Sequence, residues 1–172
     1  MYFKQSLFLL SNLQKFHEIL LNPNCIERNP PYMKEEITVS WLDKMAFSTV
    51  VNGHPLILDA NKESGGENRR PRPKHLMLVA LAGCTAMDVV SLLEKMRIKL
   101  AGLRVTVAGD ITDDHPKHFI RMHIIYNFSG KDLAMEKLKK AVDLSQQKYC
   151  GVSATYRKAM ELTSEINVAE SE

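Results

Sequence analysis

The chain has 172 residues, of which 45% are apolar and 25% charged, and its formal net charge is +3. These values are typical of one globular domain that buries its own core, and so mild a positive charge does not favour nucleic acid as a partner. Three scattered cysteines are too few for a secreted disulfide framework, and without a CxxC pair the chain has no thioredoxin-type redox motif. The lack of a run of 18 apolar residues leads us to expect no membrane span.

Residues 1–32 are expected to lie outside the compact domain, which we place at 33–172. The segment SLFLLSNLQKFHEILL has helical apolar spacing, and NPNCIERNPPYM is a linker rich in helix breakers. The apolar patch is shorter than a signal-peptide core, and no small-residue cleavage site follows it. Two interpretations stay open: a real additional helix, or a start assigned upstream of the true one. Cys25 in this linker is interpreted as an incidental thiol.

Three short strands are predicted at residues 36–42, 44–51 and 54–60. Their side chains alternate between apolar and polar, and Asn52-Gly53 is a hairpin signal between the second and the third. We expect an antiparallel meander, followed by a polar loop at 61–73.

A long helix is predicted from about Pro73 to Arg97, because proline suits the first turn of a helix. Between Leu76 and Leu93 it is apolar on nearly all sides, which is typical of a helix at the centre of an assembly. A second copy of the chain would cover this helix, so we expect a homodimer. The alternative is that the N-terminal segment provides the cover.

The rest of the chain is predicted to contain a second hairpin and two helices. We expect strands at 103–112 and 118–128, a helix at 132–147, a shorter helix from Cys150 to about Leu162, and a last edge strand at 164–168. The order of strands, long helix, hairpin and two helices predicts the α+β class, and not a βαβ repeat.

Two cysteine-containing segments resemble the OsmC/Ohr family of osmotically induced and organic-hydroperoxide-resistance proteins. They are HLMLVALAGCTAMDVVSLLEKMR, which contains Cys84, and DLSQQKYCGVSATYRKAMEL, which contains Cys150. The similarity extends over residues 35–168. It implies an OsmC-like fold, in which antiparallel sheets wrap around long central helices, and an intertwined homodimer with active sites at the interface.

The resemblance also implies thiol-dependent reduction of organic hydroperoxides, with Cys84 as the peroxidatic and Cys150 as the resolving cysteine. A thiolate attacks the peroxide, and the resulting sulfenic acid condenses with a second thiol. An external dithiol, such as that of a lipoylated protein, would reduce the disulfide. No cofactor and a cytoplasmic location are expected. The alternative is a non-catalytic protein of the same dimeric fold that binds a small apolar ligand in a pocket lined by the cysteines.

The chain departs from the family pattern beside the first cysteine. The family usually has a glutamate just after the proline that opens the long helix, where it helps to fix an arginine beside the thiolate; Lys74 and His75 stand there in this chain. His75, Arg72 and Asp88 are the possible activating or substrate-pocket residues. A straight helix places His75 opposite Cys84 and about 13 Å away along the axis. Asp88 follows Cys84 by one turn on the same face, and we expect it to accept hydrogen bonds or to form an ion pair across the interface.

Five polar residues near the second hairpin could suggest a metal site. They are Asp113, Asp114, His115, His118 and His123. His118 and His123 are separated by an odd number of residues, which would place them on opposite faces of a strand. We therefore expect a polar hairpin tip and no metal.

Overall fold

The computed structural model describes residues 33–169. The predicted N-terminal extension, 1–32, lies outside the described residues, so the two interpretations given for it remain predictions. Residues 33–38 contain no helix or strand. The compact unit that contains the elements below begins at Val39.

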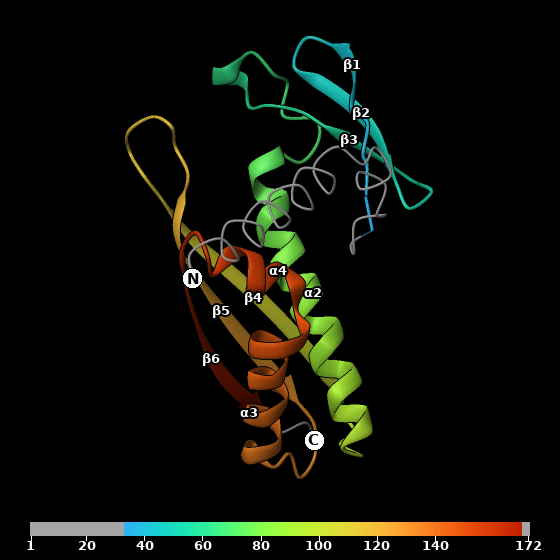
Figure 1. Cartoon of the computed structure of the whole chain (residues 1–172), viewed down its shortest axis with the longest axis vertical. Helices are drawn as coiled ribbons and strands as arrows, with labels where there is room; N and C mark the ends of the chain where they lie inside the picture. Colours follow the sequence, from blue (N-terminus) through green and yellow to red (C-terminus); the bar gives the residue numbers. More distant parts are fainter. Residues whose placement is uncertain (1–32, 170–172) are drawn as a thin grey trace, which may run out of the picture. The chain divides into compact units, whose positions relative to one another are not determined.

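The first three strands form the predicted antiparallel meander: β1 (Ser40–Asp43), β2 (Ala46–Val51) and β3 (His54–Leu58), paired in that order (Figure 1). Asn52 and Gly53 have φ values of 51° and 82°, as a type I′ hairpin turn requires. The first strand begins at Ser40 and not at residue 36 as predicted. Ile37 and Val39 are exposed. Because these apolar side chains are not buried, residues 36–39 gain no packing energy that would extend the strand.

The long helix α2 (Pro73–Lys95) is present almost as predicted, with Pro73 in its first turn. Its buried residues are Leu81, Thr85, Val89 and Leu93, which recur every four residues and therefore form one stripe. This stripe packs against the helices and the sheet of the second half of the chain.

The second sheet consists of β4 (Gly102–Ile111), β5 (Phe119–Ser129) and β6 (Glu161–Ala169) in that order. The predicted hairpin of β4 and β5 is antiparallel, whereas β6 pairs parallel with β5. This sheet is therefore mixed, and not purely antiparallel as the resemblance implied. Alternate residues of β5 are buried and form much of the core: Met122, Ile124, Tyr126 and Phe128.

Two helices and a π-helical turn connect β5 to β6: α3 (Met135–Leu144), the π-helix η3 (Ser145–Tyr149) and α4 (Gly151–Tyr156). The prediction that the last helix reaches Leu162 is wrong, because α4 ends at Tyr156 and β6 begins at Glu161. Met160, Leu162 and Ile166 all pack against the core, and their even spacing is that of a strand. The strand predicted at 164–168 is confirmed and longer than expected. The α+β class is confirmed.

Much of the apolar surface of α2 is exposed within one chain. Val79 is 62% exposed and Met87 75%. By length and composition α2 could cross a membrane, with a mean hydropathy of 2.1 over its most apolar 18 residues. The central helix of a globular domain meets the same criterion, and the contacts of α2 with α3, α4 and β4 are those of such a helix.

Candidate active site

The position of Cys84 follows from the buried stripe of α2. Thr85 and Val89 lie in the stripe and are fully buried. Cys84 and Asp88 each precede one of these residues, so they lie along the edge of the stripe and are half-buried. Because they are four residues apart, their side chains lie on the same face of the helix.

Cys150 reaches the same place from the other side of the core. The π-helix ends when the backbone amide of Cys150 donates to the carbonyl oxygen of Ser145 at 2.8 Å, and the chain then becomes extended at Cys150. Cys150 is the N-cap residue of α4, and its sulfur accepts from the amide of Ser153 at 3.3 Å. It is 1% exposed.

The structure brings together three of the five site residues that the sequence suggested. The sulfurs of Cys84 and Cys150 and a carboxylate oxygen of Asp88 all lie within 4.8 Å of one another. Both thiols are free. A disulfide requires a sulfur–sulfur distance of about 2.05 Å, so the two cysteines are close enough for side-chain rotation and a small backbone shift to join them.

The surroundings of Cys84 raise the pKa of its thiol. Burial is the largest cause, and the Cys150 side chain and the negative charge of Asp88 act in the same direction. The backbone amide of Val152, at the start of α4, acts in the opposite direction. Within the described residues, no lysine, arginine or histidine makes a hydrogen bond or an ion pair with Cys84, Asp88 or Cys150.

A buried network of hydroxyl groups holds Asp88 in place. Ser145 Oγ donates to Asp88 Oδ2 at 3.1 Å, and Thr85 Oγ1 lies 2.9 Å from Ser145 Oγ and 2.5 Å from the Tyr126 hydroxyl. Gln146 Nε2 also donates to the Tyr126 hydroxyl, at 3.4 Å. The sequence patterns did not point to these supporting residues. Their positions in the sequence were the available signal, since Thr85 directly follows Cys84 and Ser145 precedes Cys150 by five residues.

Among residues 33–169, neither His75 nor Arg72 makes a hydrogen bond or an ion pair with Cys84 or Cys150. Arg72 is the N-cap residue of α2, and His75 lies in its first turn with its amide bonded to the Arg72 carbonyl. Both are exposed. Nine residues of regular helix separate His75 from Cys84, which corresponds to about 13 Å along the axis. α2 is a continuous α-helix from Pro73 to Lys95, so His75 remains only a prediction as an activating residue, as does Arg72.

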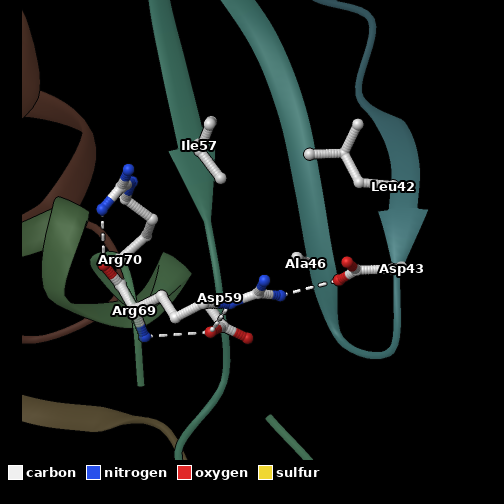
Figure 2. Close-up of a pocket in the computed structure, with 7 residues that line it drawn as sticks. All are labelled: Leu42, Asp43, Ala46, Ile57, Asp59, Arg69 and Arg70. Carbon is white, nitrogen blue, oxygen red and sulfur yellow. Dashed lines mark hydrogen bonds and ion pairs between the residues drawn. The ribbon is translucent and has the colours of Figure 1, made fainter. Parts of the chain in front are cut away.

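Arg69, another arginine of the polar loop, bonds to residues of the first sheet and of the segment that follows it, and Arg70 donates to the carbonyl oxygen of Arg69. Figure 2 shows Arg69 between Asp59 and Asp43, with an Arg69 Nη2 to Asp43 Oδ1 distance of 2.7 Å. The buried Asp59 carboxylate accepts hydrogen bonds from the backbone amides of Ala60, Glu67 and Arg69. These hydrogen bonds lower the pKa of Asp59, and the one from the Arg69 amide is the largest cause. These contacts fix the loop that contains the short helix η2 (Lys62–Ser64).

Two of the three histidines near the second hairpin, His118 and His123, bond to other groups. His118 Nδ1 lies 2.7 Å from the carbonyl oxygen of Pro116, and His123 Nδ1 lies 2.7 Å from Thr163 Oγ1. Among the described residues, the one cluster of potential metal ligands is that of Cys84, Asp88 and Cys150.

Comparison with known proteins supports the family resemblance. Protein YhfA of Escherichia coli strain K12 is 32% identical over 131 residues, which are 76% of this chain and 95% of YhfA. The crystal structure of a hypothetical protein from Aquifex aeolicus VF5 is 25% identical, with a TM-score of 0.71 over 82% of this chain and 100% of that one. An organic hydroperoxide resistance protein from Elizabethkingia anophelis shares the fold at 16% identity, with a TM-score of 0.62 over 80% of this chain and 99% of that one.

The sequence model of the family described as OsmC-like protein matches residues 65–165. This range covers more than half of the chain and includes both cysteines, and the likeness to YhfA extends over most of the same region. The chain therefore belongs to the OsmC-like protein family.

Proposed function

We propose that this protein is a thiol-dependent peroxidase that reduces organic hydroperoxides. The observation that carries the proposal is the proximity of Cys84 and Cys150, whose sulfurs lie within 4.8 Å of each other although they are 66 positions apart in the sequence. Cys84 is half-buried and Cys150 fully buried. This suits an attacking thiol that peroxide reaches and a resolving thiol that is sheltered from it.

The reaction has two chemical steps and a recycling step. The Cys84 thiolate attacks one peroxide oxygen, the O–O bond breaks, and the alkoxide leaves as the alcohol after it takes up a proton. The sulfur of Cys150 then attacks the Cys84 sulfenic acid, so that a disulfide forms and water leaves. An external dithiol, such as that of a lipoylated protein, reduces the disulfide and becomes oxidised itself.

The site's apolar surroundings support an organic hydroperoxide as the substrate. Cys84 packs against the core cluster, and Cys150 belongs to it. The alkyl chain of an organic hydroperoxide would pack against these apolar side chains, whereas hydrogen peroxide has no apolar group to bury.

We further propose that the enzyme works as a homodimer through the exposed apolar face of α2. We also propose that it is cytoplasmic, since free thiols persist in a reducing compartment.

The test is peroxide consumption with cumene hydroperoxide and either dithiothreitol or a lipoylated reductant. Wild type should turn over, Cys84→Ser should lose activity, and Cys150→Ser should accumulate a sulfenic acid that dimedone traps on Cys84. Cys25→Ser is the matched control and should keep the wild-type rate. Equal rates for wild type and Cys84→Ser would refute the proposal.

One observation favours a second candidate, a non-catalytic protein that binds a small apolar ligand. Within the described residues, no positive side chain stabilises the Cys84 thiolate, and Asp88 opposes it. Binding of a fluorescent apolar probe, retained by Cys84→Ser but lost when Cys84→Phe fills the space beside the two sulfurs, would support this candidate if peroxide consumption is absent.

A further inference from the structure

We propose that the reduced site binds a thiophilic divalent cation, of which Zn²⁺ is the probe, through Cys84, Cys150 and Asp88. The three ligand atoms come from two elements, α2 and the start of α4, and lie within 4.8 Å of one another. Thiolate and carboxylate oxygen are ligands that zinc takes in proteins. Two sulfurs on one tetrahedral zinc are about 3.8 Å apart, a separation that side-chain rotation can reach from this arrangement.

Charge supports the proposal. The site combines a carboxylate with two ionisable thiols, and no positive side chain of the described residues bonds to any of the three. A bound divalent cation would supply the missing positive charge and hold both thiols as thiolates.

The surrounding hydrogen bonds suit a metal site. The Ser145 hydroxyl donates a hydrogen bond to Asp88 Oδ2 and is itself hydrogen-bonded to the Thr85 hydroxyl, so these contacts orient the Asp88 carboxylate. The amide of Ser153 fixes the sulfur of Cys150. Such supporting contacts orient metal ligands and raise affinity. Cys84 and Asp88 are half-buried within one chain, so a cation would enter past them and would take its fourth ligand from solvent.

Metal binding and oxidation would exclude each other. A cation that holds both sulfurs withdraws the lone pair that attacks peroxide, and a disulfide removes both thiolate ligands. Zinc would therefore act as an inhibitor of the reduced protein and not as a cofactor. This inhibitory consequence rests on the peroxidase function proposed above, whereas the binding itself does not.

The experiment is a Co²⁺ titration of the full chain, reduced and metal-free, in a Cys25→Ser background. Thiolate-to-cobalt charge transfer reports sulfur ligation directly, and Zn²⁺ competition against a chromophoric chelator gives the affinity. We expect one equivalent to bind, the charge-transfer band to fall by about half in Cys84→Ser and in Cys150→Ser, and oxidation by diamide to abolish it.

Asp88→Asn tests the third ligand and should weaken Zn²⁺ binding by at least about tenfold. Asp143→Asn changes an exposed aspartate on α3 and is the matched control, expected to leave the affinity unchanged. Circular dichroism verifies that each variant is folded. The absence of a band in the reduced protein, its persistence after oxidation or in the double cysteine variant, or equal affinities of Asp88→Asn and Asp143→Asn would overturn the proposal. None of these readouts requires turnover, so they remain decisive if peroxidase activity is absent.

Discussion

At the scale of single residues, the unusual feature of the site is the carboxylate beside the thiol. A cysteine that reacts with peroxide needs its thiolate form, yet burial, Cys150 and Asp88 all raise the pKa of Cys84. The family's glutamate holds an arginine near the thiolate, whereas Asp88 bonds to the hydroxyl of Ser145. Asp88 therefore does not replace that glutamate in the described chain.

Asp88→Asn should lower the pKa of Cys84, because it removes a negative charge that disfavours the thiolate. The pH at which iodoacetamide alkylation of Cys84 reaches half its maximal rate should shift to lower pH. The measurement uses a Cys25→Ser background with a chelator present. An unchanged alkylation profile would show that the charge of Asp88 does not reach the sulfur.

Thr85→Val should destabilise the fold through the hydroxyl network. Valine keeps the shape of threonine but leaves the buried Tyr126 and Ser145 hydroxyls each with one partner fewer. Loss of a buried hydrogen-bond partner costs about 1–3 kcal/mol, which should appear as a lower free energy of unfolding in urea. Thr106→Val, at an exposed position of β4, is the matched control. Equal stabilities of the two variants would contradict a structural role for the network.

At the scale of elements, the π-helical turn determines where Cys150 lies. The five residues of η3 replace one α-helical turn, and the bond from the Cys150 amide to Ser145 spans five residues instead of four. Such insertions often occur at functional sites, and here the insertion places the second sulfur next to α2.

Deletion of Gln147 should separate the two cysteines. One residue fewer restores α-helical spacing and rotates the following chain by about 100°. Disulfide formation between Cys84 and Cys150 under diamide, followed by counting of free thiols, should then be slowed at least about tenfold or lost, whereas the exposed substitution Gln147→Ala should behave as wild type. Rapid disulfide formation in a folded deletion variant would show that the π-turn is not needed.

At the scale of the whole molecule, α2 is a core helix on one side and an exposed apolar surface on the other. A groove of about 430 Å³ runs between α2 and β4 and is lined in part by Met87, Val90 and Leu103. Exposed apolar surface of this kind is typical of a face that binds another protein. A second copy of the chain is the partner we propose.

Met87→Glu should convert a dimer into a monomer, because a charge would be buried against the partner's apolar surface. Sedimentation equilibrium of wild type and variant measures the change. Met135→Glu makes the same substitution at another exposed methionine, on α3, and should leave the dimer intact. A monomeric wild type, or equal dissociation constants for the two variants, would refute the proposed interface.

The sequence by itself predicted much of this fold and three residues of the candidate site, Cys84, Asp88 and Cys150. Alternation and the Asn-Gly signal predicted the first sheet, and proline with helical apolar spacing predicted α2, because these patterns reflect local backbone preferences and burial on one face. The motif around each cysteine was sufficient to identify the family.

Only the tertiary structure decided which groups surround the sulfurs. Ser145, Tyr126 and Thr85 come from three elements, and their hydroxyls meet only because α2, η3 and β5 pack around one core. The end of α4 and the parallel pairing of β6 likewise depend on a partner strand far away in the sequence. Distances between residues remote along the chain result from packing, which no local pattern records.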